Sequence, residues 1–218
     1  MSATIETKPR GLVCKTPQVL ALLNGATQIR VPMKKQPFLN QSGNWDFLFN
    51  NKFWEIAWFN MTDGLLKQNL NYTTISPYQS GDVIYVKETW CTIPFQGRIY
   101  YEYRADSYAA GLNGENPFGE YWKRSTQMPY EAARIIRTVA WVRVERVQDI
   151  STADSYSQAV GGTYGETGKK LGWPGDDYEW DNKNAQEAFS WFYQSLHGPE
   201  SWERNDWVWV YDLTPATP

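Results

Sequence analysis

Four segments with alternating hydrophobic and polar residues constrain what this chain can fold into more than any other feature. They are residues 81–90 (GDVIYVKETW), 98–106 (RIYYEYRAD), 138–147 (TVAWVRVERV) and 206–213 (DWVWVYDL). Alternation with a period of two places successive side chains on opposite faces of a strand. The sequence therefore predicts a sheet of at least four short strands, each with one face toward a hydrophobic core.

The last of these segments has one face made entirely of indole side chains. Val208 and Val210 alternate there with Trp207 and Trp209. Such a face either packs under a helix or forms an exposed platform on which bases stack.

Three helices are predicted, at residues 16–25, 151–162 and 184–198. In the first, Thr16 is the expected N-cap and Gly25 the expected stop in the left-handed conformation. Helices and strands in mixed order predict an α+β fold, and more specifically a small mixed β-barrel with flanking helices.

One domain is expected for residues 1–218, with an aromatic-rich insertion at about 38–77. The insertion shows no sustained periodicity apart from one possible strand at 53–60 (FWEIAWFN). Its many Trp and Phe residues are unlike those of a disordered linker, so we expect it to be ordered and packed on the barrel or on a partner. Residues 161–181, rich in Gly and Asp, are expected to form an exposed loop.

The composition excludes several classes of protein. The chain has 218 residues, of which 42% are hydrophobic, enough for a substantial core. It has no apolar run near the roughly 20 residues that span a bilayer, and no apolar core of a signal peptide, so we expect a cytoplasmic protein without a membrane partner. Cys14, Cys91 and a single histidine support neither a disulfide framework nor a zinc site. Both cysteines are expected to be core thiols, and no metal or cofactor is expected.

The charge is distributed unevenly. The net charge is −3, but residues 1–80 carry eight Lys and Arg against four Asp and Glu, whereas residues 151–218 carry four against eleven. This is weaker than the basic stripe of proteins that hold long nucleic acids. Aromatic residues make up 16% of the chain, which suits a packed core and also suits stacking on bases.

Several segments together resemble the ASCH-domain family, in the branch common in phages and prophages and often labelled morphogenetic protein. They include TPQVLALLNGATQIRVPMKKQP, GDVIYVKETW, YEYRAD, STQMPYEAARIIRTVAWVRVERVQDIS and SWERNDWVWVYDL. The resemblance implies a PUA-like β-barrel whose cleft binds RNA, DNA or a modified nucleoside, in the cytoplasm of a bacterial host. Some ASCH proteins are N4-acetylcytidine amidohydrolases, which use a Lys and a Thr from the loop after the first helix, together with a Glu.

The loop that carries this chemistry differs in the present chain. Hydrolytic relatives commonly read G-R-K-T-Q-T-R-R, whereas residues 25–30 read GATQIR. The Lys has no counterpart, and Ile29 lies where the nucleophilic Thr would be. Gln127 also replaces a His that relatives often carry. Hydrolysis needs an activated nucleophile, so the resemblance favours binding without hydrolysis.

Seven residues are candidates for binding a nucleotide: Thr27, Gln28, Arg30, Glu88, Tyr103, Arg104 and Gln127. Three residues are weak catalytic candidates, in case some activity remains: Thr27, Lys87 and Glu88. Amides, arginines and carboxylates can bind base edges or phosphates.

Each candidate also has a purely structural interpretation. The loop at 27–30 would then be a helix cap with a solvated arginine, and Tyr103 would be a core residue. Glu88 would form an ion pair with Arg104 or Arg143. Two other interpretations are structural only: a surface charge ladder at 143–146, and a favourable contact of His197 with a helix dipole.

The expected function is therefore a nucleic-acid or modified-nucleotide binding module of phage or prophage origin. One alternative is an amidohydrolase or nuclease acting on a modified nucleobase or RNA. The other is a phage protein that binds a host protein, for example one of a defence system.

Overall fold

The structure is a computed structural model that describes residues 8–34, 36, 44–50, 53–62, 65–69, 75–160 and 184–215. For 44–69 only the backbone is described.

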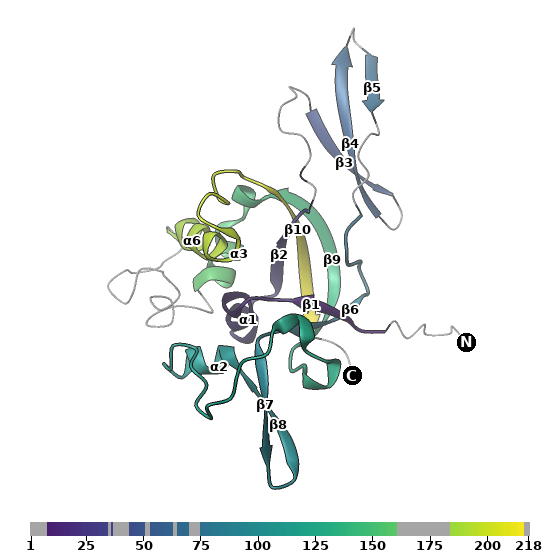
Figure 1. Cartoon of the computed structure of the whole chain (residues 1–218). Helices are drawn as coiled ribbons and strands as arrows, with labels where there is room; N and C mark the ends of the chain where they lie inside the picture. The colour runs from purple at the N-terminus through teal and green to yellow at the C-terminus, as the bar shows by residue number, and fades with distance from the viewer. Residues whose placement is uncertain are drawn as a thin grey trace, which may run out of the picture.

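A five-stranded mixed sheet forms the centre of the described structure (Figure 1). The strands are β1 (Arg10–Val13), β2 (Gln28–Pro32), β6 (Val83–Lys87), β9 (Ile136–Arg146) and β10 (Trp207–Pro215). Their order is β1-β6-β9-β10-β2, in which the β1–β6 pair is parallel and the other pairs are antiparallel. The four strands predicted from alternation include three of these five.

A bulge interrupts the pairing of β9 with β10. Asp212 pairs with Trp141 and Leu213 with Val139, so Ala140 is the extra residue. The bulge lets both Val139 and Val142, three positions apart, point into the core.

Two smaller sheets accompany the central one. β3 (Asn44–Asn50), β4 (Phe53–Thr62) and β5 (Leu65–Asn69) form an antiparallel ladder. This ladder contains the strand expected at 53–60 and two more that its sequence did not predict. The expected packing of the insertion depends on side chains outside the described residues and stays a prediction, as does the loop at 161–181.

The second small sheet is a hairpin of β7 (Trp90–Phe95) and β8 (Arg98–Tyr103), which projects away from the central sheet (Figure 1). Gln96 and Gly97 both have positive φ, the two-residue turn geometry that matches strand twist.

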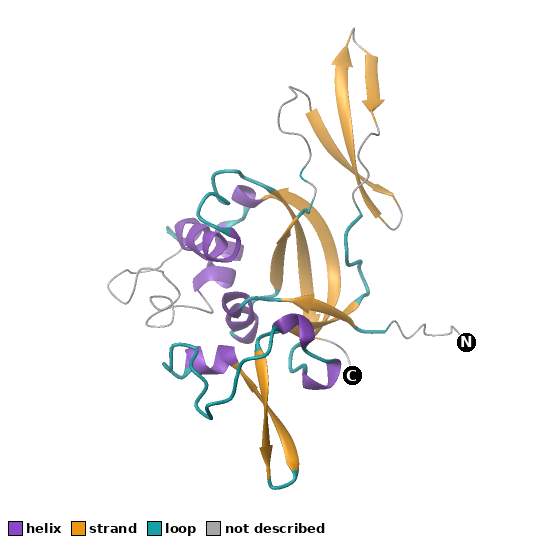
Figure 2. Cartoon of the chain, in the orientation of Figure 1, coloured by secondary structure: helices purple, strands orange, loops and turns teal. Residues whose placement is uncertain are grey.

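Helices gather on one side of the central sheet (Figure 2). They are α1 (Thr16–Leu23), α2 (Arg104–Ala109), α3 (Thr152–Ser155), the π-helical turn η4 (Tyr156–Val160) and α6 (Ala185–His197). Short 3-10 turns lie at η1 (Ser125–Gln127), η2 (Tyr130–Ala132) and η3 (Val147–Asp149). No described helix is long and apolar enough to cross a membrane.

Local sequence explains most of these boundaries. Lys15, not Thr16, is the N-cap of α1, and its backbone N–H donates to the side chain of Gln18. Gly25, with φ of +97°, ends that helix as predicted. Ser151 caps α3 by accepting a hydrogen bond from the N–H of Asp154.

Two hydrophobic clusters meet at β10, whose residues alternate between them. Trp209, Tyr211 and Leu213 pack in the larger cluster with α1 and β6, while Val208 and Val210 pack under α6. The indole face at Trp209 is therefore core, not an exposed stacking platform.

The structure confirms the α+β class. The five strands are not closed into a barrel, because β1 and β2 are the two edges of the sheet order. Cys14 and Cys91 are buried free thiols, as expected.

Gly114 supplies a test of this packing. Its φ is +76°, and a Cβ built there would lie 2.5 Å from Cε2 of Tyr108, whereas Gly119 has φ of +74° and open space around it. Both Gly→Ala substitutions incur the left-handed backbone cost, but only Gly114→Ala adds steric overlap. We expect Gly114→Ala to lower the free energy of unfolding by about 1–3 kcal/mol more than Gly119→Ala, measured by urea denaturation. Equal losses would contradict the close approach of the Tyr108 ring.

Candidate functional site

The candidate residues divide into two separate groups in the structure. Gln28 and Arg30, from β2, line a pocket under α6, whereas Glu88 and Tyr103 meet around Arg134 at the base of the hairpin. No hydrogen bond or ion pair of the described residues joins the two groups. The seven candidates therefore do not form one site.

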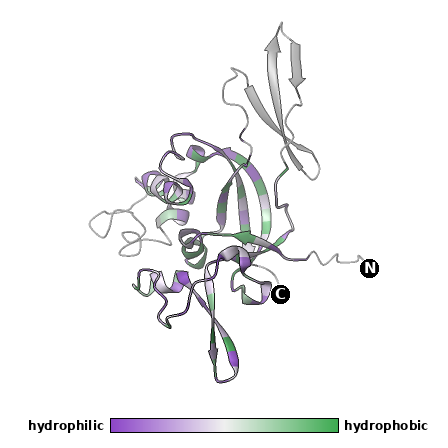
Figure 3. Cartoon of the chain, viewed as in Figure 1, coloured by the Kyte–Doolittle hydropathy of each residue, from purple (hydrophilic) through white to green (hydrophobic). Residues whose placement is uncertain are grey.

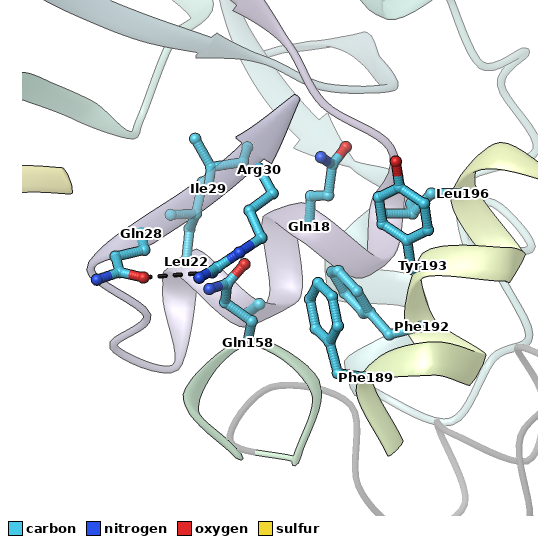
Figure 4. Close-up of a pocket in the computed structure, with 11 residues that line it drawn as sticks. Gln18, Leu22, Gln28, Ile29, Arg30, Gln158, Phe189, Phe192, Tyr193 and Leu196 are labelled. Carbon is cyan, nitrogen blue, oxygen red and sulfur yellow. Dashed lines mark hydrogen bonds between the residues drawn. The ribbon is translucent and has the colours of Figure 1, made fainter. Parts of the chain in front are cut away.

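The pocket lies between α1, β2, η4 and α6 (Figure 4). We call it the amide pocket, because three glutamine side chains contribute to its wall. Its lining residues are Gln18, Ala21, Leu22, Gln28, Ile29, Arg30, Gln158, Phe189, Phe192, Tyr193 and Leu196.

Arg30 is the charged residue of the pocket wall, and it is only 3% exposed. Its Nε donates to Glu145 at 2.7 Å, and its terminal nitrogens reach Asp154 at 3.4 Å and Gln28 at 3.3 Å. Its guanidinium lies 5.7 Å from the ring centroid of Phe189. Burial lowers the pKa of Arg30, and the Glu145 carboxylate opposes this shift. Arg30 is thus a buried cation, each of whose three nitrogens has a partner, and the solvated cap predicted as its alternative is wrong.

Arg143 extends this network across the sheet. It donates twice to Asp212 at 2.8 Å and once to Glu145 at 3.3 Å. The group Gln28, Arg30, Arg143, Glu145, Asp154 and Asp212, which we call the Arg30 network, contains two arginines and three carboxylates. Arg143 and Glu145 were expected in a charge ladder on the surface. They belong instead to this partly buried network.

Gln158 has an unpaired polar atom in the pocket wall. It is 3% exposed, and its Nε2 is buried without a hydrogen-bond partner. Figure 4 shows its side chain pointing toward Arg30. A buried donor without an acceptor costs about 1–3 kcal/mol, and the hydroxyl of Tyr193 in the same wall also has no partner.

The enclosed space of the pocket is small. Its volume is about 10 Å3, close to the minimum that holds one water molecule. The enclosed space therefore has room for no more than about one water-sized group.

The described residues of the pocket wall include no side chain well suited to act as a nucleophile. Ile29 is buried in the wall, whereas Thr27 is exposed and outside it, with its carbonyl bound by the N–H of Leu213. The one hydroxyl among the lining residues belongs to Tyr193, and burial raises the pKa of that phenol. A phenol with a raised pKa is a weaker acid and is seldom ionised at neutral pH.

The second group is centred on Arg134. Nε and Nη2 of Arg134 donate to the two oxygens of Glu88 at 2.9 and 3.0 Å, and Nη1 donates to both oxygens of Asp106 at 2.8 Å. Its guanidinium lies 4.0 Å from the ring centroid of Tyr103. We call Glu88, Tyr103, Asp106 and Arg134 the Arg134 clamp. It fixes the end of β6, the end of β8 and the start of α2 to one side chain.

Glu88 is buried, as predicted for a pocket residue, but it lies in an ion pair. Burial raises the pKa of Glu88, and the hydrogen bonds from Arg134 oppose that rise. An ion pair was the structural alternative for Glu88, but its partner is Arg134, not Arg104 or Arg143 as predicted.

The remaining candidates lie around this clamp. Arg104 contacts the Tyr108 ring, and the Lys87 amine donates to the carbonyl of Thr126. Gln127 is exposed beside Met128, whose sulfur accepts from the Glu88 N–H. None of these residues lines the amide pocket.

His197 is the last residue of α6, but the dipole explanation for it is wrong. Burial, and then the Lys15 charge, lower the pKa of His197 to about 4, so the ring is neutral at pH 7. Lys15 instead supplies the cation at this helix end, since its amine donates to the Leu196 carbonyl.

Sequence reasoning missed Gln158 and Arg134. Gln158 belongs to a helix predicted from its cap, but alternation and capping say nothing of an unpaired amide. Arg134 lies within the segment AARIIR that supported the ASCH resemblance, and this was the signal that could have identified it.

The described residues contain no cluster of three or more His, Cys, Asp or Glu side chains that would hold a metal ion. Comparisons of the chain with family models, curated proteins and solved structures found no match.

The buried position of Arg30 predicts a large effect on stability. Arg30→Met removes the cation from Glu145 and leaves a carboxylate that is 17% exposed without its main partner. We expect a loss of about 3–5 kcal/mol of unfolding free energy. The control is Arg10→Met, which breaks the exposed pair with Asp82 and should cost about 1 kcal/mol or less. Similar losses for the two variants would show that the Arg30 network is not the structural element described.

The Arg134 clamp predicts a pH dependence. Arg134→Met should cost about 3–5 kcal/mol at pH 7, because Glu88 is left charged and buried. The pKa of a glutamate in the unfolded chain is about 4.3. When the pKa of the same carboxyl is higher in the folded state, the fold loses stability as the pH rises above that unfolded-state pKa. Urea denaturation should therefore show the variant regaining stability, relative to the wild type, as pH falls from 7 toward 5. Glu88→Gln in the same background should restore stability at pH 7 and abolish that pH dependence.

Proposed function

We propose that this chain is an ASCH-type, PUA-like module of phage or prophage origin, which binds a nucleic acid or a modified nucleotide without hydrolysing it. The binding site is the amide pocket. It accepts one polar group of a nucleobase or of a base modification, while the base lies at the mouth.

The observation that carries this proposal is the unpaired Nε2 of Gln158. A carbonyl or ring nitrogen of a base would accept its hydrogen bond and remove the cost of the buried donor. Amide side chains are well suited to base edges, because they offer a donor and an acceptor side by side. Gln28 and Gln18 add two further amides to the same wall.

The charges around the pocket decide which part of a nucleotide enters. The Arg30 network has three carboxylates against two arginines, and both guanidinium groups already bind carboxylates. A phosphate would meet repulsion there without a free cation. A neutral base, or a neutral group attached to it, meets no such penalty. The phosphate of a nucleotide would therefore remain outside the pocket.

The absence of a suitable nucleophile among the described lining residues favours binding over hydrolysis. Ile29 occupies the wall where the loop of hydrolytic ASCH relatives carries its Thr, and the raised pKa of Tyr193 disfavours its ionised form. An enzyme of the amidohydrolase class would need a hydroxyl, thiol or amine in this position.

The fold is compatible with the PUA-like part of the proposal. The α+β class with flanking helices fits the resemblance, whereas the five-stranded sheet is open and not a barrel. Closure of the sheet into a barrel is not required for this pocket, since its wall comes from one edge strand and the helices beside it.

The test is a comparison of Gln158→Leu with Gln127→Leu. Isothermal titration with cytidine, N4-acetylcytidine and the other common nucleosides should detect binding to the wild type. Gln158→Leu should weaken that binding about tenfold, because it removes one hydrogen bond to a largely desolvated group. Gln127 is exposed and outside the pocket, so Gln127→Leu should bind normally.

Stability measurements separate a lost contact from a damaged fold. The Nε2 group of Gln158 is buried without a partner, and removing such a group is neutral or stabilising, so Gln158→Leu should unfold at the same or a higher temperature. Release of cytidine from N4-acetylcytidine would establish the enzyme alternative. Failure to bind any nucleoside would overturn the proposal and favour the host-protein alternative.

A further inference from the structure

The β3–β4–β5 ladder has two unequal faces. Its register sets residues of β3 directly opposite residues of β4, and two residues paired in this way share a face of the sheet. On one face, every such pair joins two large apolar residues: Trp45 with Trp58, Phe47 with Ile56, and Phe49 with Trp54. We call these six residues the apolar face.

The opposite face has a different composition. Each of its β3–β4 pairs contains a polar or charged residue: Asn44 with Phe59, Asp46 with Ala57, Leu48 with Glu55, and Asn50 with Phe53. An antiparallel sheet with this asymmetry has one face suited to water and one suited to burial. The apolar face therefore requires a cover.

No described element supplies that cover. Hydrophobic and polar residues also mix along the strands of the central sheet (Figure 3), but there α1 and α6 pack on the hydrophobic ones. Figure 1 shows the ladder standing apart from the central sheet, and Figure 2 shows no described helix beside it. Monomeric soluble proteins rarely expose contiguous apolar patches of more than a few hundred Å2, so the cover comes from another molecule.

The size of the apolar face suits an interface between two proteins. An aromatic residue buries about 150–250 Å2, so the five aromatic residues of this face amount to roughly 750–1,250 Å2. A standard interface buries about 800 Å2 on each partner. One such face is thus sufficient for a stable complex.

We infer that the apolar face packs on the same face of a second copy of this chain, one sheet on the other. A two-fold axis brings the same surface of both copies together, and two sheets stack face to face in this way in β-sandwiches. Interfaces of homodimers are rich in aromatic residues and poor in charged ones at their centre, as this face is. Lys67 and Asn69, which share this face on β5, form a polar rim beside it.

A partner that carries phosphates fits the ladder less well. Its described residues include two carboxylates, Asp46 and Glu55, against the single cation Lys67. Nucleic acids and anionic bilayers are bound through clustered cations. The inference does not rest on the amide pocket, which is built from other elements.

Analytical ultracentrifugation of the full chain over a dilution series tests the inference. The wild type should sediment at twice the mass of one chain and dissociate on dilution. Its tryptophan emission should shift to longer wavelength over the same concentrations, as indole groups enter water. Ile56→Lys should raise the dissociation constant at least about a hundredfold, because an amine would be desolvated between the two sheets.

The matched control is Ala57→Lys. It introduces the same cation one position along β4, on the opposite face, where Asp46 is the register partner. This variant should keep the dissociation constant within about twofold of the wild-type value, since its amine stays in water. Phe47→Lys, at the register partner of Ile56, should act like Ile56→Lys. Circular dichroism should show equal strand content in all three variants.

Three results would overturn the inference: a wild type that stays monomeric at every concentration, a dimer that Ile56→Lys and Phe47→Lys leave intact, or equal dissociation by Ile56→Lys and Ala57→Lys. The first result concerns the wild type alone and needs no variant to fold. Nucleoside titration of Gln158→Leu probes the amide pocket, so failure of one proposal is distinguishable from failure of the other.

Discussion

Burial of β10 on both faces is the constraint on which the rest of the structure depends. An antiparallel strand with one solvated face needs only one hydrophobic cluster, but β10 separates two. Its aromatic side, at Trp209 and Tyr211, requires α1 and β6 across the curved sheet. Its valine side, at Val208 and Val210, requires α6. The helical layer is therefore a necessary cover for a strand that would otherwise expose valines to water.

Charged residues join the layers where hydrophobic contact ends. The Arg30 network connects β2, β9 and β10 with α3, and the Arg134 clamp connects β6, β8 and α2. Buried ion pairs contribute little net stability compared with hydrophobic residues of the same shape, but removing one partner is costly. Such pairs specify how elements meet. This explains why Arg30 and Glu88 are buried without being free to bind a ligand.

The sequence predicted the elements better than their contacts. Period-two alternation identified β6, β9 and β10, capping and glycine signals identified α1 and α3, and apolar residues at helical spacing identified α6, because these signals act within a few residues. The strand β5 was missed because its residues, LLKQN, do not alternate, whereas β3 was missed although its residues, NWDFLFN, do alternate. The partners of Glu88 and Arg30 were missed for a different reason. Glu88 meets Arg134, 46 residues away, and Arg30 meets Glu145, 115 residues away, and no local pattern records such distances. Gln158 was missed because what distinguishes it is a missing partner, which a sequence cannot display.

The π-helical turn η4 forms part of the wall of the amide pocket and also sets which of its side chains faces the pocket. Each π turn holds one residue more than an α turn, so the segment from Tyr156 to Val160 is wound differently from α3 just before it. The direction in which Gln158 points is set by that extra residue. An insertion or deletion of one residue here would rotate the amide by about 100° around the helix axis, and with it Ala159, which packs against α6. Chains that share this fold could thus exchange one pocket-facing side chain for its neighbour through a change in helical winding, without any substitution in the pocket itself.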